Sequence, residues 1–122
     1  MPARRDFDPV LEIPKLVPWV ALVDVLHDPL DFRFRLIGSG IVDRSRRNNT
    51  GKLFSEIPQF GPGNYLWSHR ATVVETCAPL RAEPPYVGRM RGVSRVADIH
   101  LPLSEDDTVV NMIFTVVAFR SD

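Results

Sequence analysis

The chain of 122 residues has one cysteine, no net charge and no long apolar run. The lone Cys77 excludes an internal disulfide framework and any zinc site built from several cysteines. Fifteen Lys and Arg residues balance fifteen Asp and Glu residues, which disfavours a general nucleic-acid or membrane-surface binder. No stretch reaches the ~18 apolar residues of a membrane span, and the first residues lead into no secretory signal. We therefore expect a cytoplasmic protein without a membrane partner.

The chain has enough apolar sequence, 44% of its residues, for one compact core. Residues 1–19 form a separate arm, because prolines at positions 9, 14 and 18 limit it to short helical turns. We expect the main domain to span residues 20–122. The arm carries more apolar side chains than a free tail would, so we expect it to pair two copies as a homodimer. The predicted interface residues are Leu11, Ile13, Leu16, Val17 and Trp19.

Hydrophobic periodicity predicts five strands and one main helix. Residues 31–37 alternate strictly, with Phe32 and Phe34 opposite Arg33 and Arg35. Residues 109–119 are apolar on nearly both faces, which is typical of a strand in the middle of a sheet. We predict strands at 20–26, 31–37, 80–90, 94–103 and 109–119, and the main helix at 65–78. The fold class is then α+β, a five-stranded antiparallel sheet of order 2-1-5-4-3 with helices on one face.

Four stretches of the chain resemble a known family: 34–42 (FRLIGSGIV), 50–52 (TGK), 73–80 (VVETCAPL) and 101–104 (LPLS). With this order of elements, the chain resembles the standalone single-domain PAS proteins of bacteria over about residues 6–119. The resemblance implies a pocket between sheet and helices that holds haem, flavin, a small metabolite or nothing. It implies a sensor or protein-interaction domain that signals in trans through an unknown partner protein, and not an enzyme. One departure is that Cys77 and Ala78 stand where the main helix of the family usually ends in glycine.

Neither haem nor flavin is expected in such a pocket. His69 lies on the helix that supplies the haem ligand in haem-binding PAS domains. However, the helical projection places it about 120° from the centre of the apolar arc, toward solvent or the flank. Flavin photochemistry in PAS relatives needs a cysteine within an Asn-Cys-Arg-Phe sequence, whereas Cys77 stands within Glu-Thr-Cys-Ala-Pro. We therefore predict a colourless protein.

The most informative candidate for ligand binding is Arg70, which falls inside the apolar arc of the predicted helix. Burying a guanidinium without a partner costs several kcal/mol. Either its stem packs while its head reaches water at the pocket rim, or it lines the pocket and binds a small carboxylate or phosphate. Trp67 and Val74 share its helix and Arg35 is a second arginine candidate, which completes the predicted ligand-binding residues.

Two other functions remain open. A small enzyme of the cone-shaped α+β class would need an Asp/His acid–base site, and Asp98 and His100 share one face of a predicted strand. The alternation with Ile99 assigns that face to solvent, so we predict no catalytic residues. A basic nucleic-acid adaptor would use the arginine-rich segment Arg44–Lys52, but no aromatic residues interleave with its arginines at 44–47, so nucleic acid is not an expected partner. The sequence also contains no legible metal-ligand cluster.

Overall fold

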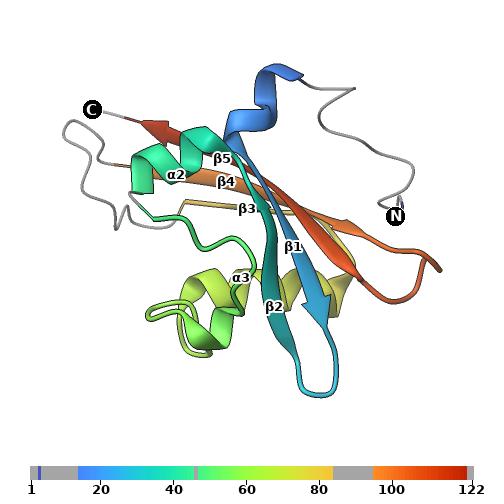
Figure 1. The fold of residues 1–122 in the computed structure, drawn as a ribbon. Coiled ribbons are helices and arrows are strands. Elements are labelled where there is room, and N and C mark those ends of the chain that lie inside the picture. Colours follow the sequence, from blue (N-terminus) through green and yellow to red (C-terminus); the bar gives the residue numbers. More distant parts are fainter. Residues whose placement is uncertain (1–2, 4–13, 46, 84–94, 121–122) are drawn as a thin grey trace.

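The computed structural model of the protein describes residues 3, 14–45, 47–83 and 95–120 (Figure 1). It contains one antiparallel sheet of five strands in the order β2-β1-β5-β4-β3, which confirms the predicted α+β fold and strand order. Within the described ranges, no helix is long and apolar enough to cross a membrane. The elements are, in chain order, the 3-10 helix η2 (Pro14–Trp19), β1 (Val20–Leu26), β2 (Asp31–Ile37), α2 (Ser39–Ser45), the 3-10 helix η3 (Phe54–Glu56), α3 (Tyr65–Thr76), β3 (Leu80–Ala82), β4 (Arg95–Leu103) and β5 (Met112–Arg120).

The strand boundaries follow the sequence pattern most closely where the alternation is clean. The first two strands have the predicted ends, and β5 begins three residues later than expected, at Met112. The predicted strand at 80–90 is described only as β3, and residues 84–94 lie outside the described part of the chain. The β5 strand pairs with both β1 and β4, so it occupies the centre that its apolar composition predicts.

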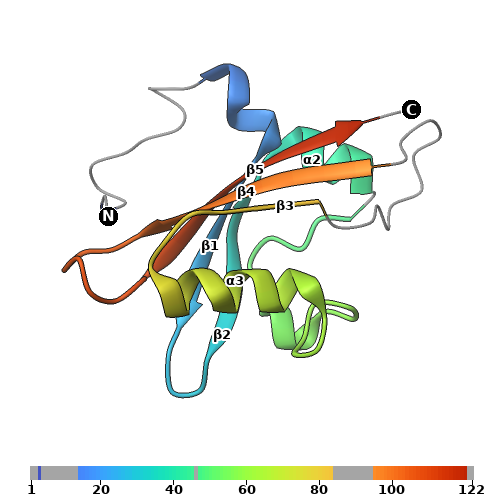
Figure 2. The same ribbon diagram turned by 180° about the vertical axis from the view of Figure 1, so that it is seen from behind.

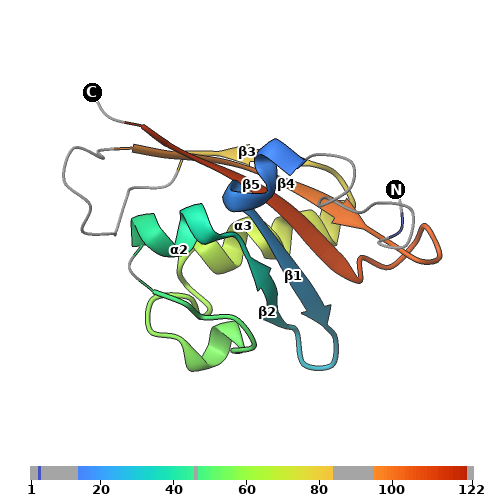
Figure 3. The same ribbon diagram turned by 45° about the horizontal axis from the view of Figure 1, so that its top comes forward.

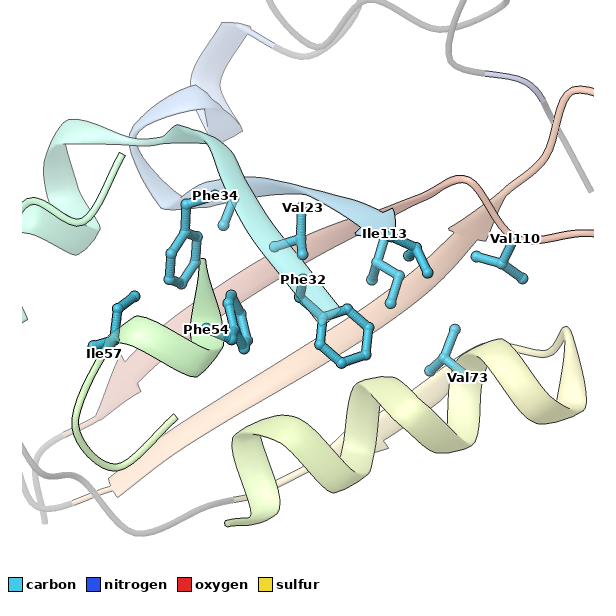
Figure 4. Packing of buried hydrophobic residues seen from close by; sticks show 10 residues of the cluster. Val23, Phe32, Phe34, Phe54, Ile57, Val73, Val110 and Ile113 are labelled. Carbon is cyan, nitrogen blue, oxygen red and sulfur yellow. The ribbon is translucent and has the colours of Figure 1, made fainter. Parts of the chain in front are cut away.

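The inner face of the sheet packs against α2, η3 and α3, which lie on the same side of it (Figure 3). Phe54 of η3 is fully buried, with its ring centroid 5.4 Å from that of Phe32 and 4.6 Å from that of Phe34. Burying an aromatic side chain of this size contributes roughly 2–3 kcal/mol. Figure 4 shows this cluster, whose buried members are Ala21, Val23, Val25, Phe32, Phe34, Phe54, Ile57, Val73, Val110 and Ile113.

A second, smaller cluster occupies the opposite, outer face of the sheet. Val20, Leu22, Leu103 and Phe114 are all at most 3% exposed there. The pairing of β1 with β2 shifts register between Leu22 and Val23, and this irregularity places Leu36 beside the outer cluster. The central strands are therefore apolar on both faces.

The short helix η2 packs on its own domain. The ring of Trp19 lies 6.2 Å from that of Phe119, and the Arg44 guanidinium lies 5.7 Å from the centre of the Trp19 ring. Trp19 is thus half-buried within its own chain, and the predicted dimer residue Val17 is also half-buried. The other predicted dimer residues cannot be placed: Leu11 and Ile13 lie outside the described residues, as does the side chain of Leu16.

The main helix α3 begins and ends at residues that suit a helix boundary. Asn64 is the N-cap, and its side-chain oxygen accepts a 2.9 Å hydrogen bond from the amide of Leu66. Cys77 is the C-cap in the left-handed conformation, with φ 54°, where a glycine is usual. The helix therefore ends at Thr76, two residues earlier than predicted, and Ala78 is exposed beyond it.

Candidate functional site

The structure corrects the prediction that Asp98 and His100 face solvent. Asp98 is 4% exposed and His100 is fully buried, whereas Ile99 between them is 42% exposed. The alternation along β4 was correctly recognised, but its polar face is the inner one. The helix α3 contacts β3 and β4 on this face, where Figure 2 shows it running along the sheet. The acidic and imidazole groups therefore lie beneath a helix that carries Arg70.

Five polar side chains meet between α3 and the sheet, and we call them the inner polar cluster: His69, Arg70, Asp98, His100 and Thr115. Nδ1 of His100 lies 2.8 Å from Oγ1 of Thr115, and Nε2 of His100 lies 3.1 Å from Oδ1 of Asp98. Nη2 of Arg70 donates to Oγ1 of Thr115 over 3.4 Å. Three strands or helices that are distant in sequence thus contribute one connected row of polar groups.

The contacts of Thr115 and Asp98 together favour one tautomer of His100. The Thr115 hydroxyl accepts from Arg70 and has its own proton for Nδ1 of His100, while the carboxylate of Asp98 beside Nε2 would repel the lone pair of an unprotonated nitrogen. A neutral imidazole that accepts at Nδ1 carries its proton on Nε2, on the side of Asp98. That N–H does not point along the 3.1 Å line to Oδ1, so the two atoms are close without forming an aligned hydrogen bond.

The burial of Arg70 contradicts the expectation that its head reaches water, and its binding of an anion stays a prediction. The residue is 4% exposed, so its head does not reach water at a rim. Nη1 donates to the Leu66 carbonyl over 3.1 Å, and the guanidinium carbon lies 5.1 Å from the centre of the Phe54 ring. Burial lowers the pKa of Arg70 to about 10, although the carboxylate of Asp98 opposes the shift. The residue therefore remains cationic at neutral pH.

The inner polar cluster is incompletely satisfied. In the part of the chain that the structure describes, four buried side-chain atoms lack a hydrogen-bond partner, and all four belong to this cluster. They are Nδ1 of His69, Nε of Arg70, Oδ1 of Asp98 and Nε2 of His100. Buried polar atoms are nearly always paired with protein, water or ligand, because each unpaired atom costs about 1–3 kcal/mol. The concentration of such atoms at one place identifies it as a candidate binding site.

The remaining predicted ligand-binding residues lie elsewhere. Trp67 packs edge-on against Phe32, with ring centroids 5.0 Å apart, and Val74 packs on the inner core. Arg35 lies apart from the inner polar cluster, because its side chain is 58% exposed and its Nε donates to Asp24 over 2.8 Å. Arg35 alternates with Phe32 and Phe34 of the inner core, so it lies on the face of β2 that is opposite to α3. Of the predicted set, Arg70 alone reaches the inner polar cluster.

His69 lies at the edge of that cluster, on the flank of α3. Its ring centroid is 6.3 Å from that of His100 and 6.1 Å from that of Tyr65. It is half-buried, and it is the one member of the cluster that is not fully buried. This half-buried position agrees with the predicted direction toward solvent or the helix flank.

The described basic residues of the segment Arg44–Lys52 lie in different environments. Arg44 contacts Trp19 and pairs with Asp43 over 3.1 Å. Arg47 and Lys52 line an open hollow of about 400 Å³. Its other lining residues are Asn48, Asn49, Ile57, Pro58 and Gln59.

Comparison of the chain with known protein families and with curated proteins found no match. Among the described residues, no group of three or more His, Cys, Asp or Glu side chains is arranged to hold a metal ion. The candidate site therefore rests on the geometry of the inner polar cluster.

Proposed function

We propose that the protein is a PAS-like sensor or interaction domain that binds a small ligand at the inner polar cluster and signals in trans. The order of the strands and the placement of α3 over the inner face support this proposal, since they agree with the PAS family that the sequence resembles, which holds its ligands between helices and sheet. The ligand carries a carboxylate or phosphate that contacts Arg70. The domain is not an enzyme in this proposal, and it uses neither haem nor flavin.

The single observation that carries the proposal is the buried guanidinium of Arg70. Among the described residues, no carboxylate forms an ion pair with it, and its Nε has no partner. A buried cation without a counter-ion is costly to fold. A ligand anion removes that cost, because a guanidinium pairs with a carboxylate or phosphate through two parallel hydrogen bonds.

The position of Thr115 gives ligand binding a route to the rest of the domain. Thr115 contacts Arg70 on the inner face, and its neighbour Phe114 belongs to the outer cluster. Thr115 also pairs with Ala21, two residues after the end of η2 at Trp19. A ligand that draws Arg70 away from Thr115 alters the strand that joins both surfaces. Its binding then favours one arrangement of the arm and the outer face over another.

An acid–base enzyme is the alternative that the buried Asp98 and His100 keep open. A general base must reach the substrate proton, and both nitrogens of His100 lie against protein groups, Thr115 on one side and Asp98 on the other. This arrangement favours a positioning role over catalysis. Chemical conversion of a ligand that binds the cluster would favour the enzyme.

A nucleic-acid adaptor receives less support from the placement of the basic residues. Arg35 and Arg33, which precede the segment Arg44–Lys52 in the chain, both approach Asp24, at 2.8 Å and 3.5 Å, so this carboxylate offsets part of their charge. Arg44 pairs with Asp43. The described cations of this region are therefore dispersed, whereas binding to a phosphate backbone uses a continuous basic face.

The test is thermal unfolding of the wild type, Arg70→Met and Arg81→Met with a panel of small carboxylates and inorganic phosphate. Arg81→Met is the matched control, because it removes the same charge from a side chain that is 63% exposed. A binding compound at a hundredfold excess over its Kd stabilises the wild type and the control by about 2.7 kcal/mol. In a domain of this size the melting temperature then rises by roughly 10 °C. Arg70→Met gives no rise.

Native mass spectrometry and the absorbance spectrum of the freshly purified protein complete the test. They report bound small molecules and any chromophore at the same time. The proposal is overturned if no compound raises the melting temperature, or if Arg70→Met responds as Arg81→Met does. A Soret band or a flavin spectrum that survives gel filtration contradicts the predicted absence of those cofactors.

A further inference from the structure

We infer that the ligand of the inner polar cluster is a zwitterion, with a carboxylate at Arg70 and an ammonium group at Asp98, as in a free α-amino acid. This inference rests on the proposed function and names the chemical class of its ligand. The observation behind it is that the cluster buries charges of both signs, at 4% exposure each for Arg70 and Asp98.

The two buried charges do not neutralise each other directly. Arg70 donates to Thr115 and to the Leu66 carbonyl, and Asp98 lies against the imidazole of His100. The lowered pKa of His100 keeps that imidazole neutral, since burial and the positive charge of Arg70 both disfavour its protonation. A neutral imidazole gives Asp98 no counter-charge. Arg70 and Asp98 attract each other across the site, but no ion pair joins them, so each can gain a direct partner of opposite sign.

Electrostatics distinguishes the ligand classes that could fill this need. A simple carboxylate neutralises Arg70 but is repelled by Asp98, and a simple amine has the reverse effect. A ligand with both charges, separated by one carbon as in an α-amino acid, gains from both residues. Because such a ligand carries no net charge, its binding leaves the net charge of the cluster unchanged.

The unpartnered atoms of the cluster match the polar groups of this ligand. Nε of Arg70 is a donor and suits a carboxylate oxygen, whereas Oδ1 of Asp98 is an acceptor and suits an ammonium proton. Nδ1 of His69 is a further unpartnered atom, on the residue of the cluster nearest to solvent. Ordered water could pair with the same atoms but would neutralise neither charge.

The experiment compares ligands that carry one or both charges, on the full chain, by isothermal titration calorimetry and thermal unfolding. The probes are free amino acids, their N-acetyl derivatives, their amides, and acetate with inorganic phosphate. The N-acetyl derivatives keep only the carboxylate, and the amides keep only the ammonium group. We expect at least one free amino acid to bind tenfold or more tightly than either of its single-charge derivatives.

Variants assign each charge to its residue. Asp98→Asn should weaken the free amino acid at least tenfold and leave its N-acetyl derivative unchanged or tighter. Arg70→Met should abolish the binding of both. Asp43→Asn is the matched control, because Asp43 is exposed and lies outside the cluster, and it should change neither affinity. If Asp98→Asn fails to fold, the comparison of derivatives on the wild type decides the inference alone.

The outcomes separate this inference from the proposed function. If N-acetyl derivatives or acetate bind as tightly as free amino acids, the zwitterion is wrong and the anion site at Arg70 stands. If phosphate alone binds, the same conclusion holds. If none of the probes binds the folded protein, the inference and the proposed function both fail, and water pairs with the buried atoms.

Discussion

At the scale of single residues, His100 has the most constrained environment in the candidate site. It is fully buried, and burial is the main cause that lowers its pKa. The positive charge of Arg70 lowers that pKa further, while the nearby carboxylate of Asp98 raises it. The imidazole is therefore held neutral at pH values where an imidazole in water begins to gain a proton.

This environment predicts that the protein loses stability in mild acid. In the unfolded chain His100 has its ordinary pKa of about 6.5, so below that pH the unfolded state binds a proton that the folded state excludes. The free energy of unfolding should fall by up to about 1.4 kcal/mol per pH unit from pH 6.5 down to the folded pKa. Urea denaturation of wild type and His100→Gln between pH 7.5 and 5 measures this. Equal pH dependence of the two proteins would contradict the prediction.

At the scale of elements, the junction of η2, β2 and α2 depends on the close approach of backbone segments. A Cβ atom at Gly38 would overlap the carbonyl oxygens of Val17 and Pro18, and the amide of Gly38 donates to the Val20 carbonyl over 2.7 Å. These overlaps involve backbone rather than flexible side-chain ends. The turn between β2 and α2 therefore requires glycine at position 38, because the backbone of η2 packs directly against it.

We predict that Gly38→Ala destabilises the protein by about 3 kcal/mol or more, because backbone must move to make room for one methyl group. Gly61→Ala is the matched control, since a Cβ there meets nothing within 4 Å. That variant should change the free energy of unfolding by about 0.5 kcal/mol or less. Chemical denaturation measures both, and equal effects of the two substitutions would disprove the packing argument.

At the scale of the whole molecule, the proposed function makes the outer cluster and the arm the surfaces that a ligand signal would reach. The outer face is continuous with the start of β1 at Val20, which follows directly on η2. In the proposed function, the packing of Trp19 on Phe119 of the central strand links β5 to the end of the arm. Such a change in the arm has an effect only if a second protein, or a second copy of this chain, binds the changed surface.

We predict a homodimer in solution that depends on the apolar residues of the arm. Deleting residues 1–13 removes Leu11 and Ile13 but leaves η2 and its contacts with Gly38 in place. The truncated chain should be a monomer by size-exclusion chromatography with light scattering, at concentrations where the full chain is a dimer. The Gly61→Ala protein serves as a full-length control. A truncated chain that remains dimeric would assign the interface to the outer face of the sheet.

Much of the fold could be predicted because its signals are local. Strict alternation from Phe32 to Leu36 determines β2, and the apolar composition of β5 on both faces places that strand at the centre. Asn64 as the N-cap and Pro79 as a helix-breaking residue predict both ends of the main helix to within two residues. Periodicity also placed Arg70 on the buried side of that helix.

The candidate site was determined by the tertiary structure. Alternation along β4 separates Asp98 and His100 from Ile99, but it does not say which of the two faces a helix covers. That choice depends on Arg70 from α3 and Thr115 from β5, which lie 28 and 17 positions away from Asp98 in the printed sequence. A sequence records the period of each element, whereas the pairing of polar groups between elements arises only when helix and sheet pack. The sequence by itself therefore determined the sheet, and packing decided that its polar face lies inside.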